Sequence, residues 1–170
     1  MKMTNKITIN HSIDVIWKLL ADDFDKADLW MAGVPKSYAK EDGALLNEAP
    51  MIGRVCEFTS KADGPYADET ITFYDKVNYC MDVEVVPRNV KVPVEKNCLN
   101  IKLIPLGKNQ TKVIWDSDLS LKPKGILLYP IVRFGISKSF KQLLEELKYF
   151  VETGLPHPRK VTNQRKAFAA

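Results

Sequence analysis

The sequence predicts an α+β protein in which a long C-terminal helix packs against one face of an antiparallel sheet. From residue 136 to residue 151, apolar side chains recur at helical spacing and polar side chains fill the positions between them. Between residues 34 and 121 the pattern changes to short runs of alternating apolar and polar residues, separated by turn signals. The helix and the strands each have one apolar face, so we expect these two faces to pack together.

The first 33 residues predict one strand followed by two short helices. Alternation around residues 7–9 indicates a half-buried strand, and Ser12 can cap a helix that begins directly after it. A second short helix is expected around Trp30. Three acidic residues follow the first helix: Asp22, Asp23 and Asp25. They lack the spacing and the glycine of a calcium loop, so we expect a solvated loop and no metal site.

The remaining strands are expected in the region that follows. The candidates are residues 34–40, 53–61, 67–75, 76–87, 98–105 and 111–123. A turn is expected at 63–65, where aspartate, glycine and proline follow one another. Counting back from this turn places Phe58 opposite Glu69, so a direct cross-strand pair between Arg54 and Glu69 is not predicted.

Alternation also assigns the side chains that face the helix, because successive strand residues point to opposite faces. The inward set is mostly aliphatic and aromatic: Cys56, Phe58, Ile71, Phe73, Met81, Val83, Val85, Leu99, Ile101, Leu103, Val113, Trp115, Leu119 and Leu121. Its polar exceptions are Arg54, Glu69, Tyr79 and Ser117. Apolar walls with a few polar groups are typical of a ligand cavity. In the simpler interpretation, the charges reach the rim of the sheet and Tyr79 is a core tyrosine.

The long helix is expected to extend over residues 125–154 and to have two unlike halves. Residues 143–151 carry a regular aliphatic stripe, which predicts a packed core. Residues 126–140 are less regular, and Gly135 indicates either a tolerated kink or a place where another group comes close. A ligand, if bound, is expected beside three side chains of this half: Phe134, Ile136 and Phe140.

Composition and motifs argue against several classes of function. The 170 residues are 45% hydrophobic and 27% charged, and a formal charge of +4 does not indicate a general nucleic-acid or membrane surface. We expect no secretory signal, no membrane-spanning segment and, from three widely spaced cysteines, no disulfide framework, which suits the cytoplasm. Neither His11 nor His157 belongs to an evident triad or metal site, and no cofactor-binding motif is present.

The order of several local patterns resembles that of the SRPBCC superfamily, in particular its polyketide cyclase/dehydrase-like branch. The patterns are DVIWKLLADDF followed by a tryptophan, GRVCEF, ETITFYD, KVIWDSDL and LEELKYFVETG. Relatives of the birch-pollen allergen and START domains belong to the same superfamily. The resemblance implies a helix-grip fold: a curved antiparallel sheet of about seven strands around the C-terminal helix, with a cavity between them. Residues 1–154 are expected to form this single domain, and 155–170 a polar, basic and loose tail.

The resemblance also implies a function, namely binding of a small hydrophobic molecule such as a lipid, a sterol or a polyketide-like ring, as a carrier or sensor. The candidate ligand-binding residues are Trp30, Arg54, Glu69, Tyr79, Trp115, Ser117, Phe134, Ile136 and Phe140. One alternative is a cyclase, dehydratase or hydrolase with Glu69 as base, Tyr79 as donor and Arg54 as oxyanion or carboxylate partner.

A second alternative is an interaction module that contacts an acidic partner or a membrane through the basic tail. The charges of this tail are Arg159, Lys160, Arg165 and Lys166. The simplest interpretation of such a tail is a solvated terminus.

Overall fold

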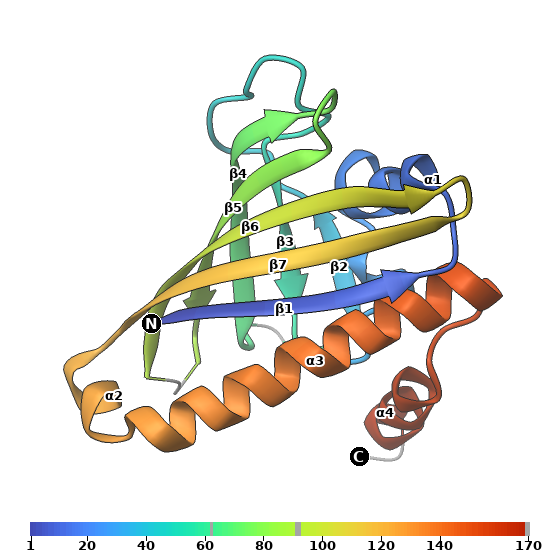
Figure 1. The fold of residues 1–170 in the computed structure, drawn as a ribbon. Helices are drawn as coiled ribbons and strands as arrows, with labels where there is room; N and C mark the ends of the chain where they lie inside the picture. The colour runs from blue at the N-terminus through green and yellow to red at the C-terminus, as the bar shows by residue number, and fades with distance from the viewer. Residues whose placement is uncertain (62, 91–92, 169–170) are drawn as a thin grey trace.

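The computed structural model describes residues 1–61, 63–90 and 93–168, with only the backbone described for residues 124 and 165–168 (Figure 1). Seven strands form one antiparallel sheet in the order β1-β7-β6-β5-β4-β3-β2. The strands are β1 (Lys2–Ile9), β2 (Lys36–Ala39), β3 (Gly53–Glu57), β4 (Tyr66–Asp75), β5 (Cys80–Arg88), β6 (Val94–Gly107) and β7 (Gln110–Leu121). The predicted helix-grip architecture is therefore confirmed.

The helices occur near the places that the sequence predicts, with two differences. The single helix expected over 125–154 is divided at Leu128, whose backbone is not helical, and a further helix lies at the C-terminus. They are α1 (Ile13–Trp17), η1 (Lys18–Asp22), η2 (Ala27–Leu29), α2 (Pro123–Leu127), α3 (Tyr129–Thr153) and α4 (Pro158–Phe168). In Figure 1, α3 runs along the length of β1 and α4 folds back beneath its C-terminal end. Gly154 ends α3 with a φ of 71°, the left-handed geometry that glycine adopts without strain. In the described residues, no helix combines the length and apolar character of a membrane span.

The main core lies between the sheet and the second half of α3. Leu144 and Leu147 of this half are almost completely buried, as the aliphatic stripe predicts. They pack in one cluster with sheet residues of the inward set that include Cys56, Ile71, Met81, Val83, Leu99, Ile101, Leu103, Val113 and Trp115. The short N-terminal helices close one end of this core through Trp17, Leu20, Phe24 and Trp30.

The pairing of β3 with β4 differs from the sequence expectation. Arg54 lies directly opposite Glu69, and Glu57 lies opposite Tyr66. The prediction that Phe58 faces Glu69 and that Arg54 and Glu69 do not pair is therefore wrong. The reason is the position of the turn: Lys61 accepts a hydrogen bond from the backbone N–H of Gly64 at 3.1 Å, so the chain reverses before the point from which the sequence count begins.

The pairing of β4 with β5 also contains an irregularity that the sequence pattern does not reveal. Ile71 pairs with Val83, but Phe73 pairs with Asp82 and Tyr74 with Met81, so a β-bulge lies between Ile71 and Phe73. A bulge adds one residue to one strand and reverses the alternation that follows it. Phe73 is consequently 45% exposed instead of facing the helix, and Tyr74 takes the inward position beside Trp17.

Two expectations about the C-terminal region are also corrected. The prediction of a loose tail is wrong for residues 158–168, because these residues form α4 and Lys160 within it is only 3% exposed. Of the two alternatives at Gly135, a close approach by another part of the chain is not seen. Apart from its two neighbours and the backbone of its own helix, no atom of the described residues lies within 4 Å of the position that its Cβ would take. Gly135 is instead tolerated within a continuous α3.

Candidate functional site

A cavity of about 890 Å³ lies between the sheet, α3, the loop at residues 31–34 and the start of α4. Its sheet wall is formed by residues of β3, β4, β5, β6 and β7: Arg54, Cys56, Ala67, Glu69, Val85, Asn97, Leu99 and Trp115. Its helical wall includes Ser139, Phe140, Gln142, Leu143 and Glu146 of α3. The rings of Trp115 and Phe140 meet edge to face inside this wall, with centroids 6.3 Å apart. Most of the lining is therefore apolar, with a few polar groups at fixed places.

Two buried charges in the sheet wall of the cavity, Arg54 and Glu69, form an ion pair. Nε and Nη2 of Arg54 lie 2.9 and 2.8 Å from Oε2 of Glu69. The third contact of the guanidinium is a hydrogen bond of 2.8 Å from Nη1 to the backbone carbonyl of Phe24, and the group also stacks 3.9 Å above the Phe24 ring. Burial alone would lower the pKa of Arg54, but the Glu69 carboxylate offsets this effect and the pKa lies above its ordinary value. The pair is thus held as two compensated charges.

Cys56 lies beside this pair and also lines the cavity. Burial raises the pKa of its thiol to about 12, although Arg54 acts in the opposite direction. Because the thiolate is the nucleophilic form, this cysteine is an unreactive part of the wall at neutral pH.

A second group of polar side chains lies further along the sheet, on β6 and β7. Asn97 Oδ1, Trp115 Nε1 and Ser117 Oγ are buried and have no hydrogen-bond partner among the described residues. Buried polar atoms are normally paired, so each unpaired one requires an explanation. Asn97 and Trp115 line the cavity, and Ser117 lies on the same face of β7 as Trp115.

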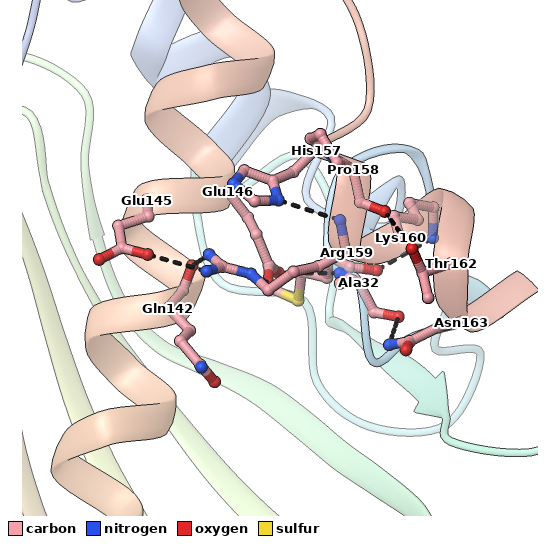
Figure 2. Close-up of polar contacts among 11 residues, drawn as sticks. Ala32, Gln142, Glu145, Glu146, His157, Pro158, Arg159, Lys160, Thr162 and Asn163 are labelled. Atoms are coloured by element: carbon pink, nitrogen blue, oxygen red, sulfur yellow. Dashed lines mark hydrogen bonds and ion pairs between the residues drawn. The ribbon is translucent and has the colours of Figure 1, made fainter.

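Helix α4 is attached to α3 by a cluster of charged contacts beside the cavity (Figure 2). Glu146 of α3 accepts a hydrogen bond of 2.8 Å from the backbone N–H of Ala32 and one of 2.9 Å from Nε of Arg159. Arg159 also donates to the Glu145 carboxylate and to the Gln142 carbonyl, each at 2.9 Å. One arginine of α4 therefore joins three residues of α3, and one of these, Glu146, also anchors the loop.

Lys160 fastens α4 to the same loop from the other side. Its Nζ donates to the backbone carbonyls of Met31 and Val34, both at 2.9 Å, and Asn163 Nδ2 donates to the carbonyl of Ala32 at 3.0 Å. Burial lowers the pKa of Lys160, because the ammonium is partly removed from water. Together these contacts make α4 a cover over one end of the cavity.

The structure brings four of the predicted site residues to the cavity and leaves the others elsewhere. Arg54, Glu69, Trp115 and Phe140 line it. Ser117 is buried beside Trp115 and Trp30 is buried in the core, neither of them in the lining. Ile136 packs against the small cluster of Met3, Val94 and Leu119, and Phe134 is 74% exposed on the outer side of α3.

Tyr79 lies in a different part of the molecule from Glu69. Glu69 pairs with Val85, six residues along from Tyr79, a separation of roughly 20 Å at the rise of a β-strand. The hydroxyl of Tyr79 donates to Asp14, and its ring packs against Trp17. The hydrogen bond to Asp14, more than burial, raises the pKa of Tyr79. The predicted set of Glu69, Tyr79 and Arg54 is therefore not assembled as one catalytic group.

Several lining residues were not singled out from the sequence. The inward position of Asn97 could have been predicted from the sequence, because extending the alternation of this strand two residues back from Leu99 places Asn97 on the inward face. For α4, Pro158 is a helix-start signal, since proline is favoured in the first helical turn. No sequence signal pairs Arg159 with Glu146, because the contact depends on where α4 packs.

Comparisons with known proteins agree with this architecture. The family model described as "Polyketide cyclase / dehydrase and lipid transport" matches residues 1–152. A search among curated proteins gave no match.

Three solved structures illustrate the likeness, which at these identities concerns the fold alone. An uncharacterised protein from Bacillus thuringiensis is 16% identical, with 89% of this chain and 98% of that chain covered and a TM-score of 0.62. A START superfamily protein from Mycobacterium smegmatis is 14% identical, with 86% of this chain and 98% of that chain covered and a TM-score of 0.57. Norcoclaurine synthase from Thalictrum flavum is 15% identical, with 90% of this chain and 87% of that chain covered and a TM-score of 0.62.

Proposed function

Because this chain belongs to the polyketide cyclase / dehydrase and lipid transport family, we propose that it binds a small hydrophobic molecule between its sheet and α3, as a carrier or sensor. The observation that carries the proposal is the cavity of about 890 Å³, whose wall is mainly apolar. Cavities that hold small molecules typically measure about 300–1,000 Å³ and combine apolar walls with a few placed polar groups.

The charges around the cavity support binding more than catalysis. Arg54 is paired with Glu69, and Arg159 is paired with Glu146. A general base must reach the proton that it removes, and here the carboxylate of the sheet wall, Glu69, is held by the guanidinium of Arg54 beside it. The predicted proton donor for such chemistry, Tyr79, lies far from Glu69 and is engaged with Asp14. A guest in this cavity is therefore surrounded by apolar side chains and compensated charges.

An enzymatic function is the second candidate, and the presence of a carboxylate in the cavity wall is the observation that favours it. Norcoclaurine synthase, which shares the fold, has been solved with dopamine and hydroxybenzaldehyde. If Glu69 acts as a base here, Glu69→Gln abolishes turnover of such a substrate while the circular dichroism spectrum stays unchanged. Turnover that persists in Glu69→Gln removes this residue from any mechanism.

The interaction-module alternative loses two of its charges. Arg159 and Lys160 are engaged within the chain, by Glu146 and by backbone carbonyls. The side chains of Arg165 and Lys166 lie outside the described residues.

The binding proposal is tested by native mass spectrometry of the purified protein, followed by solvent extraction and identification of any released molecule. In parallel, an environment-sensitive apolar dye is titrated into wild type and into Leu143→Trp, which places an indole in the cavity lining. Ile131→Trp, on the 72% exposed surface of the same helix, is the matched control. We expect saturable dye binding in wild type and Ile131→Trp and its loss in Leu143→Trp. Absence of both an extracted guest and saturable dye binding in wild type contradicts the proposal.

A further inference from the structure

An exposed apolar surface covers α2 and the first turns of α3. Fifteen large apolar side chains are exposed in the described residues, and six of them lie within residues 126–134. Single exposed apolar residues are ordinary on a protein surface, but a clustered group marks contact with another protein or with a membrane. We call this group the α2–α3 patch, and its members are Ile126, Leu127, Leu128, Tyr129, Ile131 and Phe134.

The patch lies at one end of the molecule, and its side chains are presented together. In Figure 1, α2 lies at the opposite end of α3 from α4. Ile131 and Phe134 are three residues apart on α3 and are therefore neighbours on its surface, with 72% and 74% of their side chains exposed. Tyr129, Arg133 and Phe134 also line one open hollow. Two aromatic rings and a guanidinium thus meet at the same place on the surface.

The charge of this region is entirely positive. Residues 119–144 contain no aspartate and no glutamate, and their five basic residues are Lys122, Lys124, Arg133, Lys138 and Lys141. The formal charge of +5 in this segment exceeds the +4 of the whole chain, so the total charge conceals a local basic region. Lys122, Arg133 and Lys138 are exposed, and within the described parts of the chain none of the three forms an ion pair.

An apolar surface surrounded by positive charge is complementary to a membrane that contains anionic lipids. The headgroups attract lysine and arginine, while the apolar side chains enter the boundary between the headgroups and the acyl chains. A second copy of this chain matches the patch less well. A symmetric contact through the same patch would bring two positive regions together, and like charges repel.

We propose that the α2–α3 patch is a docking surface for a membrane that contains anionic lipids. Leu127, Ile131 and Phe134 enter the interfacial layer of the membrane, and Lys122 and Lys138 contact its anionic headgroups. This inference goes beyond the proposed function, because it concerns an outer surface of the protein and is independent of any guest in the cavity.

The test is co-sedimentation of the full chain with vesicles. Vesicles of phosphatidylcholine alone are compared with vesicles of an equimolar mixture of phosphatidylcholine and phosphatidylserine. We expect binding to the mixture to be at least about tenfold tighter at low ionic strength, and this preference to shrink as salt screens the charges. Equal binding to both vesicles, or binding to neither, overturns the inference. The proposed function then still stands, because the dye titration that tests it contains no lipid.

The apolar part of the patch is tested by the double variant Leu127→Gln/Phe134→Gln. Both side chains are exposed, so the fold is retained and is checked by circular dichroism. Binding to the mixed vesicles is expected to weaken by roughly tenfold or more. The matched control is Val77→Gln/Leu106→Gln, which changes two exposed apolar residues in the β4–β5 turn and near the end of β6 and retains wild-type binding. Unchanged binding in the patch variant overturns the inference. So does a wild-type dimer, measured by sedimentation velocity, that this variant dissociates and that binds no vesicles, because a second copy then covers the patch.

The basic part of the patch is tested by Lys122→Gln/Lys138→Gln. An exposed lysine near an anionic membrane strengthens binding by roughly fivefold, so we expect this variant to bind the mixed vesicles about twentyfold more weakly. Lys102→Gln/Lys108→Gln is the matched control, because it removes the same charge from exposed positions elsewhere in the chain and retains most of the affinity. An equal loss in this control would show that only the total charge matters, and would overturn the assignment to the patch.

Discussion

Replacing Arg54 by methionine tests whether the Arg54–Glu69 pair is a structural unit that makes the cavity wall neutral. The two side chains are only 7% and 10% exposed, so the change leaves the Glu69 carboxylate buried without its cation. Breaking a buried ion pair on one side costs about 3–5 kcal/mol. For a chain of this size we expect the melting temperature to fall by roughly 6–20 °C. The measurements are urea unfolding for the free energy and thermal unfolding for the melting temperature, both monitored by circular dichroism.

The double variant Arg54→Met/Glu69→Leu separates the loss of the pair from the loss of packing. Both charges are then removed together, and apolar replacement of a buried pair is often neutral or stabilising by about 1–4 kcal/mol. We therefore expect the double variant to regain most of the lost stability, with a coupling energy of about 3 kcal/mol. Lys96→Met is the control, because its pair with Glu84 is 44% and 38% exposed and is worth about 0–1 kcal/mol. The reasoning is refuted if Arg54→Met costs no more than this control, or if the double variant is less stable than both single variants.

Three further changes test other parts of the structure. Leu147→Asp buries a charge at a fully enclosed position of α3 and is expected to cost about 4 kcal/mol or more in chemical denaturation. Burial alone would raise the pKa of Glu152, but the hydrogen bond from Lys148 helps to hold this pKa below its ordinary value. This carboxylate therefore stabilises the fold above pH 4.5 and loses that contribution as the pH falls through the lowered pKa. The stability gap between wild type and Glu152→Gln should accordingly close on acidification, and a gap that widens would contradict this sign. Lys160→Met removes both hydrogen bonds to the loop carbonyls, and faster amide exchange confined to α4 is expected by mass spectrometry.

The elements that the sequence predicts well are those whose signal is local. The aliphatic stripe of residues 143–151 requires only helical periodicity, and Leu144 and Leu147 are buried accordingly. Gly154 ends α3 as expected, because a left-handed cap depends on the backbone of that one residue. The inward position of Trp115 likewise follows from alternation along β7.

The parts that sequence reasoning missed depend on contacts between distant segments. Residues 158–168 are polar, and their helix is stabilised by packing against the loop at 31–34 and against α3. Lys160 illustrates the difficulty, since a lysine in a basic segment predicts solvent exposure, yet here two backbone carbonyls accept its hydrogen bonds. Only the docked position of α4 makes these partners available.

The two errors in the predicted sheet, the register of β3 on β4 and the bulge in β4, had different consequences. The face of a side chain depends on whether a shift is odd or even, whereas its cross-strand partner depends on the exact register. The partner of Glu69 is Arg54 and not Phe58, a shift of four residues, which is even and therefore leaves every side chain on its predicted face. The bulge after Ile71 adds a single residue, which is odd, and so Phe73 changes face. Alternation was thus sufficient to place Arg54 and Glu69 in the cavity wall. Only the true register shows that they form an ion pair and compensate each other's charge within that wall.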